Sequence, residues 1–358
     1  MSTHSPKTVL VTGGCGFIGS NFLLRFVPKF PEIQFVNLDL LTYAGNPMNL
    51  KSIEEADNYT FVRADIADDD AVRDLFEKYD FTSVVHFAAE SHVDRSILDP
   101  LAFVRTNVIG TAVLLDAARR TWKTDDQPEA VGRRFYHVST DEVFGSLGDE
   151  GAFSETTPYD PRSPYSASKA GSDHLVRAYH HTFGLPIVIS NCSNNYGPFQ
   201  FPEKLVPLII ARAKREEQLP VYGKGDNVRD WLHVQDHAEA AWQILTRGQE
   251  GETYCIGGRA ERQNIEVVTT LCTLVDEALG RPLGTATENI TFVTDRPGHD
   301  FRYAMDATRL EEELGWKPAH SFEDGMRQTV HWYLENEEWL DSVMNQSYRD
   351  YINRQYQD

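Results

Sequence analysis

The sequence is poor in cysteine, in lysine and in long apolar runs, and each shortage narrows the class of protein. The four cysteines of its 358 residues form no C-x-x-C pair, which favours reduced thiols over a disulfide framework or a zinc site. No uninterrupted apolar run is long enough to span a membrane, and residues 1–7 lack the apolar core of a signal peptide. We therefore expect a cytoplasmic protein with no membrane partner and no metal.

Basic residues are scarce relative to acidic ones. Lys and Arg total 34 against 54 Asp and Glu, a net charge of −20, and only 10 of the basic residues are Lys. Nucleic-acid binding needs basic surface to neutralise phosphates, so we expect no nucleic-acid partner. An acidic, Lys-poor surface suits a salty cytoplasm or simply keeps the protein soluble, and the sequence leaves both readings open.

A glycine-rich turn near the N-terminus carries the most specific signal. A short apolar strand, Val9–Val11, runs into the turn Thr12–Gly19 and then into a helix-like stretch. Glycines at 14, 16 and 19 fit G-x-G-x-x-G, and those at 13, 16 and 19 fit G-x-x-G-x-x-G. Either spacing lets the backbone approach a pyrophosphate closely and aims a helix N-terminus at the anion. The turn therefore predicts a dinucleotide site.

The ends of the next two strands indicate which dinucleotide it is. Strand Phe35–Leu38 ends at Asp39, 20 residues after the last glycine of the turn. A carboxylate there meets ribose hydroxyls and repels a 2′-phosphate, and no Arg follows it immediately, so we expect NAD rather than NADP. A third strand, Tyr59–Val62, leads to Asp65 and Ile66, an acid–apolar pair suited to clasping an adenine.

The alternation of strands and helices predicts the fold class. The remaining expected strands and helices, in chain order, are 70–78 (helix), 83–87 (strand), 100–120 (helix), 135–139 (strand), a helix after 161–164, and 187–189 (strand). We expect an α/β fold, a Rossmann-like doubly wound parallel sheet with a smaller C-terminal substrate-binding domain. The expected division is 1–192 for NAD, with about 229–260 interleaved, and 193–358 mainly for substrate.

Two short motifs predict the chemistry. Tyr165 and Lys169 are four residues apart and share a helix face, where an ammonium can lower the pKa of the phenol and make it a base. Such a pair alone also occurs in ordinary amphipathic helices. Thr140, Asp141 and Glu142 follow strand 135–139, at the edge of the sheet where ligands bind. An adjacent acid and base are not needed for oxidation, but they are needed for elimination.

Together these motifs resemble the dTDP-glucose 4,6-dehydratase family of the extended short-chain dehydrogenase/reductase superfamily. The resemblance covers nearly the whole chain. The segments that carry it are 12–19, 86–96, 139–145, 165–169, 194–198, 201–205, 229–232 and 296–300.

The resemblance implies an NAD-dependent hydro-lyase acting on dTDP-glucose. Tyr165 would take the 4-hydroxyl proton during oxidation at C4, Lys169 would hold the nicotinamide ribose, and Thr140 would bond the 4-oxygen. Glu142 would remove the C5 proton, Asp141 would protonate the departing 6-hydroxyl, and reduction at C6 would give the 4-keto-6-deoxy sugar. The implied cofactor contacts are Gly13, Gly16, Phe17, Ile18, Gly19, Asp39, Asp65, Ile66, Ala88, Thr106, Tyr165 and Lys169.

An anionic substrate needs cationic anchors, which stand out in so acidic a chain. The expected substrate contacts are His92, Asn195, Lys204, Arg229, Asn264 and Arg296. Structural ion pairs are the alternative reading of Lys204 and Arg296. Phe301 departs from the family pattern, which has a basic residue there.

Other functions remain open at this point. Other sugar-nucleotide 4,6-dehydratases, and a 4-epimerase or decarboxylase of the same superfamily, share most of the motifs. A non-enzymatic NAD-binding regulator is a further alternative, although such proteins tend to lose the Tyr or the Lys. His233 and His237 have the spacing of a zinc motif but lack its Glu.

The resemblance also implies a homodimer. Segments 102–118 and 167–179 are rich in small and apolar residues, and in the family such helices pair into a four-helix interface.

Overall fold

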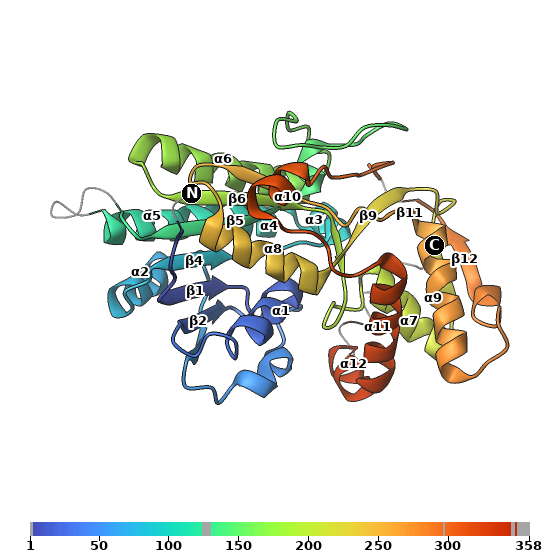
Figure 1. Cartoon of the computed structure of the whole chain (residues 1–358). Coiled ribbons are helices and arrows are strands. Elements are labelled where there is room, and N and C mark those ends of the chain that lie inside the picture. The colour runs from blue at the N-terminus through green and yellow to red at the C-terminus, as the bar shows by residue number, and fades with distance from the viewer. Residues whose placement is uncertain (1–2, 124–129, 296–297, 345–347, 349–358) are drawn as a thin grey trace.

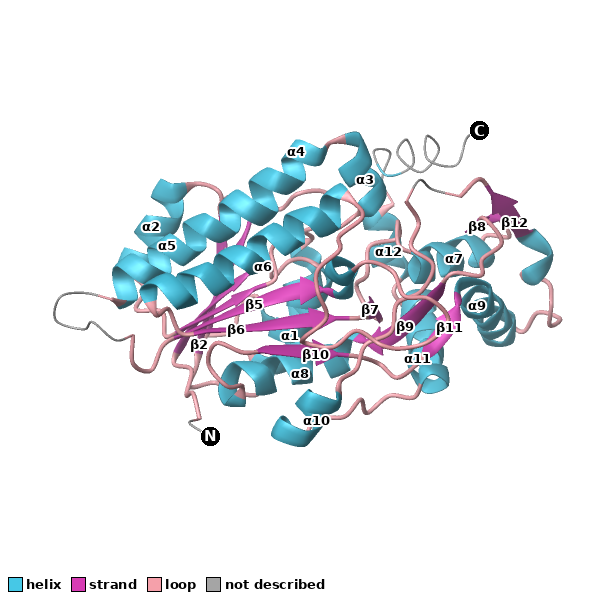
Figure 2. Cartoon of the chain, turned by 90° about the horizontal axis from the view of Figure 1, so that it is seen from above, coloured by secondary structure: helices cyan, strands magenta, loops and turns pink. Residues whose placement is uncertain are grey.

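A parallel sheet forms the centre of the molecule (Figures 1 and 2). The computed structural model describes residues 3–123, 130–295, 298–344 and 348. Within these ranges the main sheet has seven strands, all parallel. Their order is β10 (Thr253–Ile256), β6 (Ile187–Cys192), β5 (Arg134–Thr140), β4 (Ser83–His86), β1 (Thr8–Thr12), β2 (Gln34–Asp39) and β3 (Tyr59–Arg63). This is the doubly wound α/β class that the sequence predicts.

Helices cover both faces of the sheet, and Figure 2 shows the two layers. One layer contains α1 (Phe17–Phe26), α8 (Val234–Arg247) and α10 (Thr308–Leu314). The other contains α2 (Asp69–Lys78), α5 (Thr111–Trp122) and α6 (Pro164–Phe183). Burial on both faces explains why the central strands read as continuous apolar runs instead of alternating ones.

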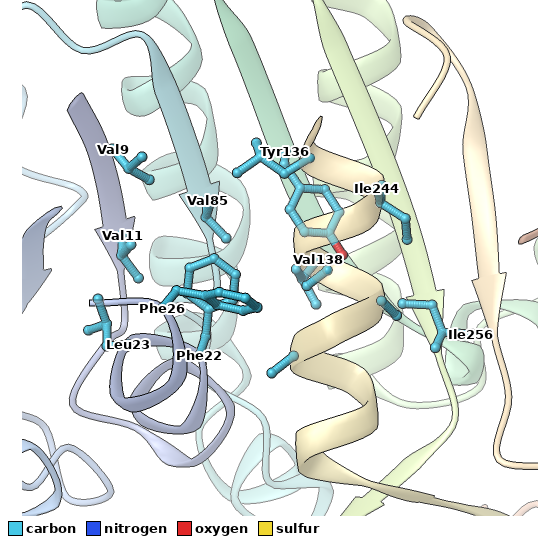
Figure 3. Close-up of a cluster of buried hydrophobic side chains, with 14 of the residues drawn as sticks. Val9, Val11, Phe22, Leu23, Phe26, Val85, Tyr136, Val138, Ile244 and Ile256 are labelled. Carbon is cyan, nitrogen blue, oxygen red and sulfur yellow. The ribbon is translucent and has the colours of Figure 1, made fainter. Parts of the chain in front are cut away.

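A cluster of large apolar side chains joins α1 and α8 to the sheet. Phe22 and Phe26 from α1, Val85 and Tyr136 on the strands, and Ile244 of α8 belong to one buried cluster (Figure 3). All five are fully buried. Burying a side chain of this size contributes about 1.5–3 kcal/mol, so this layer is a main source of stability.

A second unit with its own core lies beyond the carboxyl ends of the strands (Figure 2). A small sheet of β11 (Glu261–Gln263), β9 (Val228–His233) and β7 (Asn194–Tyr196) and a pair of β12 (Ile290–Val293) with β8 (Leu219–Tyr222) belong to it. Its helices include α7 (Leu205–Lys214), α9 (Asn264–Leu279), α11 (Phe322–Glu335) and α12 (Glu337–Val343). Strand β10 returns from this region to the main sheet. The division of the chain at residue 192 remains a proposal.

The helix expected over 100–120 is present as one helical stretch, Pro100–Trp122, but its middle turn is not α-helical. It consists of α4 (Pro100–Phe103), the π-helical turn η2 (Val104–Gly110) and α5, and α3 (Val93–Leu98) precedes it. Single-turn π-helices insert a residue into a helix and are frequent at functional sites. Short 3-10 turns complete the elements: η1 (Pro47–Ile53), η3 (Asp141–Phe144) and η4 (Thr287–Asn289).

One stretch in the described part of the chain, Pro100–Trp122, is long and apolar enough to cross a membrane by length and composition alone. Arg105 and Asp116 interrupt it. Leu114 and Leu115 are fully buried in the core between this helix and the sheet. A helix that packs in a protein core passes the same test, so the finding is weak evidence for a membrane span.

Candidate active site

The glycine turn joins β1 to α1 with no room for side chains. Gly13 has a φ of +71°, and a Cβ on it would lie 2.6 Å from the backbone of Ala88, at the end of β4. A Cβ on Gly19 would lie 2.4 Å from the carbonyl oxygen of Gly13. Helix α1 begins directly after Gly16, with Phe17 and Ile18 in its first turn. A turn without side chains at a helix N-terminus fits a pyrophosphate, because the anion can approach the backbone closely.

The adenosine side of the expected site lies at the ends of β2 and β3. Asp39 is buried, and its carboxylate accepts hydrogen bonds from the backbone N–H groups of Cys15 (2.9 Å) and Leu41 (2.8 Å). Burial raises the pKa of Asp39, and these two bonds oppose that shift. The bonds fix the carboxylate beside the glycine turn, where a ribose of NAD would meet it.

The expected adenine contacts lie against the π-helical turn. Asp65 accepts a hydrogen bond from the N–H of Ala67 at 2.9 Å. A Cβ on Gly110 would lie 2.6 Å from the side chain of Ile66, so the turn packs directly on this segment. Thr106 belongs to the same turn and is half-buried.

Thr140 connects the residues expected to perform the chemistry. At the end of β5 its hydroxyl donates to Asp141 Oδ1 and accepts from the N–H of Glu142, each at 3.2 Å. Asn191 on β6 donates to the Thr140 carbonyl at 3.0 Å, which fixes the backbone there. The acid, the base and the hydroxyl are thereby held in one tight turn, η3.

Asp141 has the environment of a carboxylic acid that keeps its proton. The side chain is 2% exposed, and its Oδ2 atom is buried without a hydrogen-bond partner. Burial raises the pKa of Asp141 well above its usual range, the neighbouring Glu142 raises it further, and Arg229 lowers it. A carboxyl group in this environment is suited to holding a proton on Oδ2 and donating it.

Tyr165 and Lys169 lie on the inner face of α6. A capping box between Ser163 and Ser166 starts this helix, with both reciprocal bonds at 3.0 Å. Tyr165 is buried on this face, and Lys169 Nζ donates to the carbonyl of Val138 at 2.8 Å. Helix α6 therefore brings this pair to the Thr140 turn.

The pKa of Tyr165 differs from the expectation. Burial raises this pKa well above its usual value, the carboxylate of Glu142 raises it further, and the bond with Thr140 lowers it. The ammonium of Lys169 donates to the carbonyl of Val138 on β5. In this structure the depression expected from Lys169 is therefore not seen.

A further buried carboxylate, Asp173, was not singled out from the sequence. It lies one turn beyond Lys169 on α6 and accepts from Ser139 (2.7 Å) and Tyr159 (2.8 Å), with His137 Nε2 at 2.9 Å. Burial alone would raise the pKa of Asp173, but His137 and Lys169 bring it below its usual value. The sequence does contain a signal for Asp173, because it follows Lys169 by four residues and so lies on the same face of the helix.

Two expected substrate contacts are held by protein partners near this turn. Arg229 is buried on β9, donates to the carbonyl of Asp300 at 2.9 Å, and stacks 4.2 Å from the ring centre of Tyr303. The charge of Arg229 lowers the pKa of Asp141. The Oδ1 atom of Asn195 lies 2.9 Å from His237 Nδ1, so this pairing orients the amide.

The other expected substrate contacts lie around the same edge. Lys204 Nζ donates to the carbonyl of Ser91 at 3.0 Å, and the adjacent His92 is buried at the start of α3. Asn264 begins α9, and its N–H donates to the carbonyl of Asn227 at 2.9 Å. Arg296 lies outside the described residues.

Two remaining features of the sequence have ordinary structural roles. The backbone of Phe301 accepts from the N–H of Val228 (2.9 Å), while its side chain is 44% exposed. His233 stacks on His320 with ring centres 4.0 Å apart. In the described ranges no group of three or more His, Cys, Asp or Glu side chains could hold a metal ion.

Comparison with known proteins identifies the family. The family described as GDP-mannose 4,6 dehydratase matches residues 10–329. A dTDP-glucose 4,6-dehydratase of Xanthomonas campestris is 57% identical over 343 residues, 96% of this chain and 97% of the relative. The dTDP-glucose 4,6-dehydratase 1 of Escherichia coli K12 is 51% identical over 358 residues, 98% and 99% of the two chains. The chain belongs to the dTDP-glucose 4,6-dehydratase family.

Solved structures agree with this assignment. A Bacillus anthracis dTDP-glucose 4,6-dehydratase in complex with NAD is 42% identical, with a TM-score of 0.84 over 94% of this chain and 99% of that one. The Streptomyces venezuelae enzyme DesIV, with NAD and a dTDP ligand, is 44% identical, with a TM-score of 0.85 and the same coverage. A Thermus thermophilus UDP-glucose 4-epimerase with NAD is more distant, at 29% identity and a TM-score of 0.79, covering 92% and 99%. Members of this superfamily therefore share the fold across different reactions.

Proposed function

We propose that this chain is an NAD-dependent dTDP-glucose 4,6-dehydratase that forms dTDP-4-keto-6-deoxyglucose. The observation that carries the proposal is the buried carboxyl of Asp141, with an unpartnered oxygen and a raised pKa, directly beside Glu142. Elimination needs an acid and a base in addition to Tyr165, whereas 4-epimerisation has no need of this second pair. The family relatives support the same activity.

The first step is oxidation at C4 of the sugar. Tyr165, as its phenolate, takes the proton of the 4-hydroxyl, and the hydroxyl of Thr140 holds the 4-oxygen. NAD, when bound, would accept the hydride from C4 and give it back at C6. Lys169 would hold the nicotinamide ribose, and the carbonyl of Val138 on β5 fixes its ammonium.

The second step is loss of water across C5 and C6. The 4-ketone makes the C5 hydrogen acidic, and Glu142 removes that proton. Asp141 donates its own proton to the 6-hydroxyl, which leaves as water, so one proton is taken up and one is released. Reduction at C6 and return of a proton at C5 complete the product. NAD, when bound, would return to its starting oxidation state in each cycle and would have no need to leave.

Substrate binding is proposed for Arg229, Asn195, Lys204, Asn264, His92 and Arg296. Arg229 supplies a buried positive charge in a chain of net charge −20, and its bonds to backbone carbonyls hold the guanidinium in one orientation. A nucleoside diphosphate gains most from such a fixed cation, because the anchor loses little entropy on binding.

We also propose a cytoplasmic homodimer without membrane or nucleic-acid partners. Large apolar side chains are exposed along α3, α4 and η2, a pattern that supports a protein interface. They are Ile97, Leu98, Leu101, Val104 and Ile109.

The deciding experiment is mass spectrometry of dTDP-glucose incubated with purified protein and no added NAD. We expect the nucleotide sugar to lose the mass of one water, which requires a cofactor that co-purifies and is recycled. An unchanged mass, with or without added NAD, would contradict the proposal. A test of 4-epimerisation with UDP-glucose would then follow.

A further inference from the structure

Three side chains from distant loops meet above the sheet. Tyr43 follows β2, Arg95 lies on α3 after β4, and Glu203 precedes α7. The hydroxyl of Tyr43 donates to Glu203 Oε1 at 2.7 Å, and Arg95 Nε donates to Glu203 Oε2 at 3.0 Å. The guanidinium of Arg95 lies 3.7 Å from the ring centre of Tyr43. We call this group the Tyr43–Arg95–Glu203 bridge.

The strand order gives the bridge its position. Strand β1 lies between β4 and β2, and there the winding of the sheet reverses. In open α/β sheets this switch point, outside the carboxyl ends of the strands, is where a dinucleotide binds. Tyr43 comes from the β2 side and Arg95 from the β4 side. Their contact therefore joins the segments on the two sides of the switch point.

The bridge is tied firmly to the expected cofactor site. The loop that carries Tyr43 also supplies the Leu41 N–H bonded to Asp39, and the N–H of Asn46 donates to the carbonyl of Cys15 at 2.9 Å. On the other side the ammonium of Lys204, next to Glu203, donates to the Ser91 carbonyl. Any movement that opens the crevice at this point must break the bridge.

The bridge is also largely shielded from water. The side chain of Glu203 is only 2% exposed, while that of Arg95 is 26% exposed. Burial raises the pKa of Glu203, and Lys204, Arg95 and Tyr43 oppose that shift. Charge-assisted hydrogen bonds in such surroundings are strong and geometrically exact, so the three loops are held together as one unit.

We propose that the Tyr43–Arg95–Glu203 bridge retains NAD between turnovers by closing the crevice over the dinucleotide. The inference rests on the proposed function, in which the cofactor is recycled within each cycle and gains nothing from exchange. Dissociation of NAD then requires the loops after β2 and β4 to separate, which breaks both bonds to Glu203 and the stacking of Arg95 on Tyr43.

The test is the rate at which bound NAD exchanges. Purified wild-type protein, Tyr43→Phe and Glu203→Gln would each be loaded with radiolabelled NAD and chased with unlabelled NAD. We expect release to be about 10–100-fold faster in Glu203→Gln, the range for loss of hydrogen bonds to a charged group, and faster to a smaller degree in Tyr43→Phe. Both variants should lose NAD on gel filtration, and added NAD should restore their turnover.

A matched control lies at the far end of the sheet. Tyr254 on β10 donates to Glu313 at 2.9 Å, and Arg309 lies 5.0 Å from its ring centre, so the same three residue types meet away from the switch point. Tyr254→Phe should exchange NAD at the wild-type rate. An equal acceleration in this control would mean that general loosening of the fold, and not the bridge, had released the cofactor.

Two results would overturn the inference in different ways. Wild-type exchange rates in Tyr43→Phe and Glu203→Gln, both folded by circular dichroism, would overturn the bridge alone. A wild-type protein that binds no NAD would overturn the proposed function together with it. Arg95→Lys, which keeps the charge but loses the planar stacking, supplies a third variant if either of the others fails to fold.

Discussion

Asp173 lies one helical turn beyond Lys169, fully buried, and its negative charge opposes the fall in the lysine pKa. Burial lowers the pKa of Lys169, so the ammonium form depends on this carboxylate. Asp173→Asn should lower that pKa further and move the alkaline limb of the kcat profile to lower pH. The measurement is kcat against pH.

The control for this shift is Tyr159→Phe. It removes one hydrogen bond to Asp173 and leaves the charge in place. An alkaline limb that moves equally in both variants, or in neither, would assign Asp173 a structural role only.

Glu142→Gln should separate the two chemical steps. The amide cannot remove the C5 proton, so elimination should slow by about 10²–10⁴-fold, the usual value of a positioned base. Oxidation at C4 uses Tyr165 and should continue. Rapid mixing in a single turnover measures NADH formation and product formation separately. An equal fall in both rates would show that Glu142 is not the base of the elimination.

Asp141→Asn should stabilise the protein at neutral pH while it removes the acid. Asp141 has a higher pKa in the folded protein than in the unfolded chain, where it is about 3.9. At a pH between these two pKa values, the folded protein therefore binds one more proton than the unfolded chain. The contribution of Asp141 to the free energy of unfolding therefore falls as the pH rises from the unfolded to the folded pKa. The gain in free energy of unfolding should appear at pH 7 and vanish below about pH 3.9 in urea titrations. A variant less stable at pH 7 would contradict this environment for Asp141.

Gly13→Ala should abolish NAD binding. The new methyl group would meet the Ala88 backbone at 2.6 Å and sit at a positive φ. Gly132→Ala is the matched control, because its φ of +74° imposes the same strain of roughly 1–2 kcal/mol with no atom within 4 Å. Calorimetric titration with NAD should show binding in the control alone. Normal binding by Gly13→Ala would remove this turn from the cofactor site.

Leu101→Glu should produce monomers. Leu101 is 76% exposed on α4, in the surface proposed for the dimer. Leu283→Glu, at a 68% exposed position outside this surface, controls for the added charge. Light scattering at micromolar concentration reports the mass. A wild-type monomer, or a Leu101→Glu dimer, would contradict the proposed interface.

Local spacing explains what the sequence could predict. The glycine turn, Asp39 at the end of β2 and the Tyr165–Lys169 pair each lie within one strand–turn–helix unit or one helix, so pattern and geometry coincide. The main strands and the doubly wound class follow from the same alternation. The π-helical turn at Val104–Gly110 was missed because apolar periodicity does not distinguish it from an α-helix.

Contacts between distant segments could not be predicted in this way. Glu203 is more than a hundred residues from both Tyr43 and Arg95, and only the strand order brings them together. Similarly, the partners of Asp173 come from β5 and the loop before α6, although its spacing from Lys169 was visible. The pKa of Tyr165 depends on the burial that such contacts create.

Strands β6 and β10 are neighbours in the sheet but far apart in the chain, which has a consequence during synthesis. Strand β6 ends at Cys192, but its outer neighbour begins only at Thr253. At typical rates a ribosome needs roughly 3–12 s to add the residues between them. Throughout that interval β6, whose residues are all buried in the finished protein, presents an open backbone edge that can capture another chain. The vulnerable species is therefore the growing polypeptide, and the yield of this protein in a cell depends on what shields that edge until translation passes β10.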